Sequence, residues 1–213
     1  MSGTRKVVKN PPADLTADLD LLPFVDRELY QKYAYYDHPD TIDVLAGRGC
    51  LYRCSFCYNS LVAKMYKGRG TFVHKHSVDY VIGELLQIKE NYSPRVFRFM
   101  DELFIMDGPW LAEFCAKYRE RIGIPFICTG RADLINEENA GLLKSAGVIG
   151  ICIGLESGNE EIRNTLLKKR ISDSDLRKMA AVLHEQGIEF LTTNMLGVPG
   201  ESIDDAFTTI RLN

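Results

Sequence analysis

The chain has 213 residues, of which 46% are hydrophobic and 26% charged, a composition typical of a globular domain with one sizeable core. Its formal net charge of -3 gives no broad basic field, which argues against nucleic acid as a partner. No apolar run approaches the ~20 residues of a membrane span, and no signal peptide follows Met1, so we expect a cytoplasmic protein without a membrane partner.

Residues 1–40 are expected to form a linker or wrapping segment that precedes a folded core at residues 41–213. The segment contains four prolines and no sustained hydrophobic period. Its aromatic residues, from Phe24 to Tyr36, predict that parts of it pack against the core.

After residue 40, strand-like and helix-like segments alternate, which predicts an α/β fold with a parallel sheet. The expected strands are residues 41–46, 95–100, 125–129, 148–154 and 188–196. The helices between and after them are expected to start at the capping residues Ser77, Asp107, Asn136, Ser172 and Ser202.

The predicted elements amount to about five βα units, whereas a closed (β/α)8 barrel takes about 250 residues. The last helix begins near residue 202 and the sequence stops in mid-pattern at Asn213. We therefore expect a barrel that is truncated after about five units.

Three cysteines follow the first predicted strand at the spacing C-x3-C-x2-C: Cys50, Cys54 and Cys57. Thiolates hold iron-sulfur clusters, and a cubane with four irons normally takes four of them, so three cysteines would leave one iron open to another ligand. A structural zinc site is the alternative, but it needs a fourth ligand such as His74 or His76, and the sequence has no second C-x2-C pair. The remaining cysteines lie in apolar periodic segments and are expected to be small buried core residues: Cys115, Cys128 and Cys152.

Polar or glycine-rich residues follow each of the later strands, where working residues of parallel barrels gather. They are Asp101 and Glu102, then Arg131, then Glu156, and finally the stretch around Gly197. Other roles remain open for each. The two acids could be solvated, Arg131 could form a surface ion pair, and Glu156 could be a charge at a helix start.

In order and spacing these segments resemble the radical S-adenosylmethionine (SAM) superfamily. Residues 21–30, together with residues 48–50 and 101–104, look most like its cobalamin-associated branch. The resemblance implies a partial (β/α)6 barrel and a 4Fe-4S cluster bound by the three cysteines, with SAM on the open iron. In the family, one electron cleaves SAM to methionine and a 5'-deoxyadenosyl radical, which abstracts hydrogen from substrate.

The resemblance also implies partners. These are a small-molecule substrate, a reductant such as a flavodoxin or ferredoxin, and cobalamin if a domain that this sequence does not contain supplies it. Methyl transfer or cyclisation is common in that branch, and methylthiotransferases are the nearest competing subfamily by motif style. The alternative from another class is a non-catalytic binding module stabilised by zinc or by a structural cluster.

By resemblance, the SAM contacts fall on residues near the cysteines and at the strand ends. Phe56 would lie beside adenine, and Asp101 and Glu102 stand where a carboxylate contacts the SAM amino group, although the family more often has Gly-Gly-Glu there. Arg131 could clamp the SAM carboxylate, because a guanidinium offers paired donors to a planar acid. Glu156 matches the carboxylate that family members direct to the ribose hydroxyls.

The last predicted contact is the run Thr193-x-Met195-x-Gly197, which resembles the family motif Gly-x-Ile-x-Gly. In the family an apolar side chain of this motif packs against adenine. Met195 is adaptable enough for that contact, but a methionine in a strand is also a common core residue, and Phe56 carries the same ambiguity.

Overall fold

The computed structural model describes residues 7–30 and 40–213. Its centre is a sheet of five parallel strands in the order β1-β4-β5-β6-β7. The strands are β1 (Thr41–Val44), β4 (Val96–Phe99), β5 (Phe126–Gly130), β6 (Val148–Glu156) and β7 (Glu189–Asn194). All five lie where the sequence predicts them, and the predicted α/β class with a partial barrel of parallel strands is confirmed.

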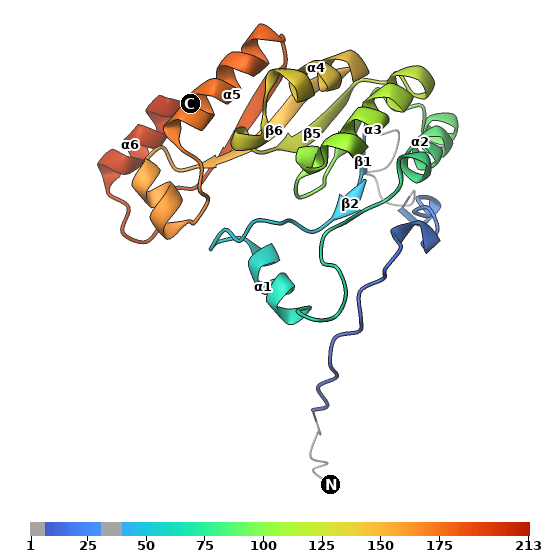
Figure 1. Ribbon diagram of the computed structural model, residues 1–213, viewed down its shortest axis with the longest axis horizontal. Helices are drawn as coiled ribbons and strands as arrows, with labels where there is room; N and C mark the ends of the chain where they lie inside the picture. The colour runs from blue at the N-terminus through green and yellow to red at the C-terminus, as the bar shows by residue number, and fades with distance from the viewer. Residues whose placement is uncertain (1–6, 31–39) are drawn as a thin grey trace.

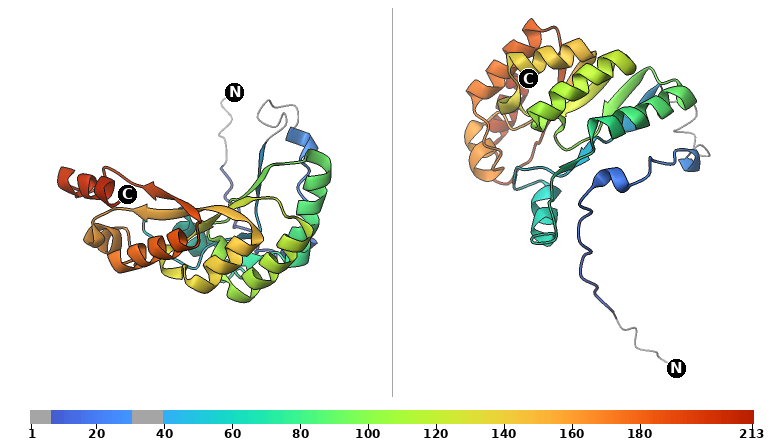
Figure 2. Two further views of the ribbon diagram at one scale, coloured as in Figure 1. Left: turned by 90° about the horizontal axis from the view of Figure 1, so that it is seen from above. Right: turned by 45° about the vertical axis from the view of Figure 1, so that its right-hand side comes forward.

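Among the described residues, the helices that pack on the sheet cover one of its faces. They are α2 (Val78–Tyr92), α3 (Gly108–Arg121), α4 (Glu137–Ala146) and α5 (Asp173–Glu185), with α6 (Ile203–Leu212) beside the β7 end (Figure 1). Figure 2 shows the sheet curving so that α2 to α5 lie on its convex side, while its concave side is left open. The molecule is therefore an open half-barrel whose strand ends meet along one rim.

Side-chain caps fix where the helices begin. The side chains of Ser77, Asp107, Asn136, Ser172 and Ser202 each accept a hydrogen bond from a backbone N–H in the first turn. Such caps satisfy donors that have no partner inside the helix. The helix starts predicted from the sequence are thus confirmed.

An aromatic cluster fills the core between the sheet and α3. Phe114 lies with its ring centroid 5.4 Å from Phe99, 5.2 Å from Phe104 and 6.0 Å from Phe126, mostly in edge-to-face arrangements. Edge-to-face packing of this kind stabilises aromatic pairs beyond the burial of their area. Cys115 and Cys128 are buried in the core, as predicted.

Several of the described elements were not expected from the sequence. A two-residue strand, β2 (Gly47–Arg48), pairs antiparallel with β3 (His74–Lys75), α1 (Tyr58–Met65) follows the cysteines, and a π-helix (Ile162–Leu166) follows β6. Two-residue strands are too short to show a hydrophobic period, and a π-turn has no distinct period of its own to detect.

The described part of the N-terminal segment, residues 7–30, contacts α2 and the loop before it through residues 20–27, whereas Leu15 donates from its N–H to the carbonyl of Arg69, after α1. The ring of Phe24 packs edge-on against Tyr80 at 4.8 Å, and Asp20 accepts a hydrogen bond from the backbone N–H of Ser77 at 3.1 Å. The predicted packing of this segment therefore holds for Phe24, while Tyr33, Tyr35 and Tyr36 lie outside the described residues. Among the described residues, none of the helices has the length and apolar character needed to cross a membrane.

Replacing the central ring of the core should destabilise the fold strongly. We expect Phe114→Ala to lower the free energy of unfolding by about 3–5 kcal/mol, because a large cavity opens among packed rings. Urea denaturation followed by circular dichroism measures this. Phe207→Ala is the control, because that ring is 50% exposed and should change the free energy by less than about 1 kcal/mol. Equal effects of the two substitutions would contradict the packing described here.

Candidate cofactor site

A cavity of about 230 Å³ lies at the rim where the parallel strands end. Its lining combines the cysteine loop with residues from the ends of β5, β6 and β7 and from the segment after the π-helix. Seven of the predicted site residues line it: Cys50, Cys54, Phe56, Cys57, Glu102, Arg131 and Glu156. Three do not: Asp101, Met195 and Gly197.

The cysteine loop is a compact turn stabilised by its own backbone. The N–H of Cys57 donates to the carbonyl of Cys54 at 3.2 Å, and the Arg53 guanidinium donates to the carbonyl of Cys50 at 2.8 Å. Burial raises the pKa of the Cys50 thiol, and the neighbouring cysteines raise it further. A positively charged metal centre would oppose this shift, since metal ligation favours the thiolate.

Glu102 ties the two ends of this loop together. One carboxylate oxygen accepts a hydrogen bond from the backbone N–H of Gly49 at 3.1 Å, and the other accepts one from the hydroxyl of Tyr58 at 2.8 Å. Gly49 comes directly before the first cysteine of the triplet and Tyr58 directly after the last. A single carboxylate on the β4 end thus sets the span of the loop.

Asp101 does not line the cavity but lies beneath the cysteine loop, where it makes buried polar contacts. Its carboxylate accepts a hydrogen bond from the backbone N–H of Ala46 at 3.0 Å and lies 3.9 Å from Nζ of Lys75. Lys75 also donates to the carbonyl of Phe104 at 2.9 Å and lies 4.0 Å from the centre of the Trp110 ring. Burial raises the pKa of Asp101 and lowers that of Lys75. These contacts join β1, β3 and α3 beneath the loop.

Arg131 lines the cavity, but protein groups already surround its guanidinium. The guanidinium stacks on the Tyr52 ring at 3.6 Å and forms an ion pair with Asp133 at 2.7 Å. It also donates to the backbone carbonyls of Lys169 and Arg170. The ion pair with Asp133 that the sequence left open is present, and Arg131 is buried rather than at the surface.

The charged groups of the cavity that remain are Glu156 and Lys169. Nζ of Lys169 lies 3.2 Å from a carboxylate oxygen of Glu156 and 5.8 Å from the centre of the Phe56 ring. A Cβ on Gly154 would lie 2.4 Å from the Glu156 carboxylate and 2.7 Å from Nζ of Lys169, so a side chain at this position would displace the charged ends of the pair. Glu156 itself has a left-handed backbone with φ of 69°.

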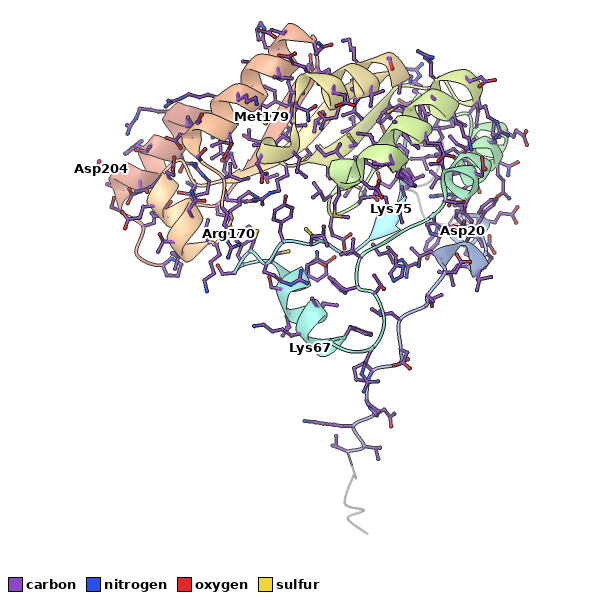
Figure 3. The ribbon with its side chains drawn as sticks, in the orientation of Figure 1. Asp20, Lys67, Lys75, Arg170, Met179 and Asp204 are labelled. Atoms are coloured by element: carbon purple, nitrogen blue, oxygen red, sulfur yellow. The ribbon has the colours of Figure 1, made fainter. Side chains whose placement is uncertain are left out.

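The segment that carries Lys169 is anchored to the cysteine loop. Ser55 donates through its N–H to the carbonyl of Leu167 at 2.9 Å and through its hydroxyl to that of Leu166 at 2.6 Å. The fully buried Arg163 donates to the carbonyl of Ser157 at 2.8 Å, which holds the π-helix against the end of β6. In Figure 3, Arg170 lies near the end of the loop that is farther from Lys75.

From the sequence, no site role was expected for several residues of the cavity wall: Tyr52, Thr129, Cys152, Lys169 and Thr193, of which Thr193 is part of the motif at the β7 end. Cys152 was predicted to be core, yet it is half-buried, because alternate residues of β6 face the concave side. That alternation was a usable signal for Cys152. No local pattern marked Lys169, which reaches the cavity only through the π-helix and its anchors.

A second cavity of about 790 Å³ lies along the concave face of the sheet. Its lining is largely apolar and includes Met100, Ile127 and Leu191. Thr129 and Cys152 line both this cavity and the cysteine cavity. The two spaces therefore adjoin, and a molecule on the concave face would lie next to the site at the rim.

The sequence model of the radical SAM superfamily matches residues 44–212, which include the cysteine loop and all the strand ends around the cavity. The chain belongs to the radical SAM superfamily. Membership implies a 4Fe-4S cluster and SAM as cofactors, so the predicted resemblance is confirmed at the level of the family.

Two curated relatives of this radical SAM chain are named as methyltransferases. It is 26% identical over 210 residues to an uncharacterized methyltransferase of Pyrococcus horikoshii, covering 97% of this chain and 44% of that protein. It is also 26% identical over 214 residues to cytidylyl-2-hydroxyethylphosphonate methyltransferase of Streptomyces wedmorensis, covering 92% of this chain and 39% of that protein. The chain thus spans less than half the length of these relatives.

Solved structures of cobalamin-dependent radical SAM enzymes share the fold. The methyltransferase TsrM from Kitasatospora setae, also solved with cobalamin and a 4Fe-4S cluster bound, superposes with a TM-score of 0.69 at 19% identity, covering 83% of this chain and 34% of that one. The cobalamin-dependent enzyme OxsB superposes with a TM-score of 0.62 at 19% identity, covering 80% of this chain and 26% of that one. The structural neighbours thus include the branch that the sequence resembles.

The close approach at Gly49 gives a test of the loop geometry. Gly49 has φ of 83°, and a Cβ there would lie 2.3 Å from the carbonyl oxygen of Phe72. We expect Gly49→Ala to distort the cysteine loop and to lose most of the iron bound after anaerobic reconstitution, as measured by iron and sulfide analysis.

Gly68→Ala is the matched control, because Gly68 has a similar φ of 78° but no atom within 4 Å of the added Cβ. It should carry only the ordinary strain of a left-handed residue, about 1–2 kcal/mol, and retain its iron. Equal iron content in the two variants would show that the contact with Phe72 does not shape the loop.

Proposed function

We propose that this chain is the core of a radical SAM enzyme, in which Cys50, Cys54 and Cys57 hold a 4Fe-4S cluster and SAM binds beside it. The observation that carries the proposal is the convergence of the three thiols with the Glu156 and Lys169 pair in a single cavity at the rim of a parallel half-barrel. Rims of this kind are where parallel barrels place their working residues.

The donor set fits a cluster better than a zinc ion. Zinc in a structural site needs four ligands converging on one point, and the candidates for the fourth were His74 and His76. Neither lines the cysteine cavity, and Nδ1 of His76 is occupied by Asp20 at 3.1 Å. Three cysteines around a cavity suit a cluster, whose ligands each bind a different iron.

The groups lining the cavity match the parts of SAM. Lys169 supplies a cation for the SAM carboxylate, and Glu156 supplies an acceptor for the ribose hydroxyls. Phe56 is 40% exposed, so its ring is available for adenine. Glu102 lines the cavity and would accept a hydrogen bond from the SAM amino group, while Asp101 lies beneath the loop.

This assignment differs from the sequence-based hypothesis at three further positions. Arg131 is better suited to hold the Lys169 segment than to bind SAM, because its guanidinium is engaged by Asp133 and by two backbone carbonyls. Met195 and Gly197 lie outside the cavity wall, where Thr193 takes the β7 position. A role for either in binding adenine would require the loop after β7 to move.

When bound and supplied with an electron, the cluster and SAM together provide a 5'-deoxyadenosyl radical for hydrogen abstraction from substrate. The protein's own groups bind and orient both cofactors, and they exclude water from the site. The adjoining concave cavity is the place for a small-molecule substrate. We further propose a flavodoxin or ferredoxin as reductant. The names of the curated relatives favour methyl transfer, and the structural neighbour solved with cobalamin bound favours cobalamin as a second cofactor.

Loss of one cluster cysteine should abolish SAM cleavage. We expect Cys54→Ala, after anaerobic reconstitution and with dithionite and SAM present, to form no 5'-deoxyadenosine above background, as measured by liquid chromatography. Cys128→Ala is the control, since Cys128 is also a buried cysteine but does not line the cysteine cavity. It should keep its iron and its SAM cleavage. Full deoxyadenosine formation by Cys54→Ala would refute the cluster assignment.

Substitution of Lys168 or Lys169 removes the same charge, so a comparison of the two variants distinguishes a contact with the cofactor from a general effect of charge. Lys169 is buried at the cavity, whereas Lys168 is exposed. We expect Lys169→Met to raise the SAM concentration needed for half-maximal deoxyadenosine formation at least about tenfold, because a charge-assisted hydrogen bond is lost. Lys168→Met should leave it within about twofold. The same half-maximal concentration in both variants would remove Lys169 from the SAM site.

A further inference from the structure

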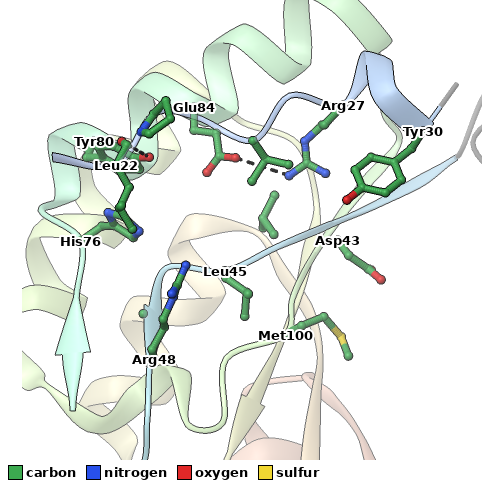
Figure 4. A pocket seen from close by; sticks show the side chains of 14 residues that line it. Leu22, Arg27, Tyr30, Asp43, Leu45, Arg48, His76, Tyr80, Glu84 and Met100 are labelled. Atoms are coloured by element: carbon green, nitrogen blue, oxygen red, sulfur yellow. Dashed lines mark hydrogen bonds and ion pairs between the residues drawn. The ribbon is translucent and has the colours of Figure 1, made fainter. Parts of the chain in front are cut away.

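A third cavity, of about 450 Å³, lies along the outer edge of β1 and is separate from the cysteine site (Figure 4). Among the described residues β1 pairs only with β4, so its other edge faces this space. The N-terminal segment at residues 22–30 and the helix α2 form the remaining walls. None of the residues that line it also lines the cysteine cavity.

Arg27 presents a largely buried cation to this cavity, and one of its buried donors has no partner. Its side chain is only 13% exposed, and its sole ion-pair partner among the described residues is Glu84, at 3.4 Å. Its Nε is buried and has no hydrogen-bond partner. A buried donor without a partner is costly, and a bound acceptor would remove that cost.

A second guanidinium comes from the opposite wall. Arg48 lines the cavity from β2, and no hydrogen bond or ion pair to another described residue engages its side chain. Figure 4 shows Arg27 and Arg48 on opposite sides of the space, with Leu45 between them. Two guanidiniums that face one space form a recognition element for a carboxylate or phosphate.

The acidic groups of the wall do not cancel this charge. Asp43 is held by Arg98 through two hydrogen bonds of 2.7 and 2.9 Å, so its charge is already balanced. Glu84 has only its long contact with Arg27. With Arg48 added, the described groups leave a net positive charge at the cavity.

The rest of the wall is apolar. Leu22, Pro23, Val25 and Leu45 line the space between the charged groups. A cavity that combines apolar walls with a few convergent polar groups is typical of a small-molecule site rather than of a site for a bare ion.

We propose that this cavity binds a small organic anion, with its carboxylate or phosphate held between Arg27 and Arg48 and its apolar body against Leu22, Val25 and Leu45. Met100 lines both this cavity and the concave one, so the ligand would lie next to the substrate space. Arg48 is also separated from Cys50 by a single residue, so occupancy would be felt at the cysteine loop. Binding itself does not depend on the cluster or on SAM.

Isothermal titration calorimetry on the full chain, as purified and without SAM, tests the proposal. The probes are phenyl phosphate, benzoate and inorganic phosphate at low ionic strength, where charge recognition is least screened. We expect the two organic anions to bind, and phenyl phosphate to bind at least about fivefold more tightly than inorganic phosphate, because only the former reaches the apolar wall.

Arg48→Gln should weaken phenyl phosphate binding at least about fivefold, and Arg27→Gln should do the same. Arg119→Gln is the matched control, because it removes the same charge from an exposed position on α3 and should change the affinity less than about twofold. Should Arg27→Gln fail to fold, Arg48→Gln alone decides, since its side chain is exposed and makes no contact on which the fold depends.

Three results would overturn the proposal. They are the absence of binding at millimolar concentrations, an equal loss of affinity in Arg48→Gln and Arg119→Gln, and equal affinity for phenyl phosphate and inorganic phosphate. The first result would show that the cavity binds no such anion. The second would show that binding reflects only the net charge of the protein. The third would show that the apolar wall does not contact the ligand. None of these results bears on the cluster, because the measurement requires neither iron nor SAM.

Discussion

The rim of this half-barrel depends on the two carboxylates that follow β4. Glu102 spans the cysteine loop from Gly49 to Tyr58, and Asp101 fixes the end of β1 beneath it through Ala46. Without both, the loop would be held by its flanking segments, by the contact of Tyr52 with Arg131 and by the hydrogen bonds of Ser55 to the segment that carries Lys169. The two neighbouring acids therefore have different roles: Glu102 lines the cavity, and Asp101 holds the backbone under the cysteine loop.

A similar division holds among the basic residues. Arg131 is engaged by Tyr52, Asp133 and backbone carbonyls, and this holds the chain that carries Lys169. Lys169 is left as the cation of the cavity, paired with Glu156. A guanidinium with several fixed donors suits the bracing role, whereas a flexible ammonium group can exchange one acidic partner for another.

Much of the architecture could be predicted from the sequence, because hydrophobic periods and capping residues are local signals. The five strands and the caps at Ser77 and Asp107 are examples. The cysteine triplet and the strand-end positions likewise located the cavity, since parallel strands bring their ends to one rim. What could not be predicted was which way a side chain at such an end would turn. Asp101 and Glu102 are neighbours in sequence, but only Glu102 reaches the cavity, and nothing local marked Lys169, whose position depends on a π-helix and on contacts with Ser55.

The backbone around Lys169 has one more property. Among the described residues, four non-glycine residues have a positive φ, and three of them are Glu156, Lys168 and Arg170. Left-handed backbone at such residues is energetically unfavourable and persists only where surrounding contacts enforce it. Conformational strain is thus concentrated in the two stretches that present the charged pair, and the buried Arg163 and the well-packed core supply the stability that tolerates it. In a variant selected for thermostability alone, we would expect substitutions that remove the left-handed backbone at these positions to appear first. Such substitutions would leave Glu156 and Lys169 less firmly positioned.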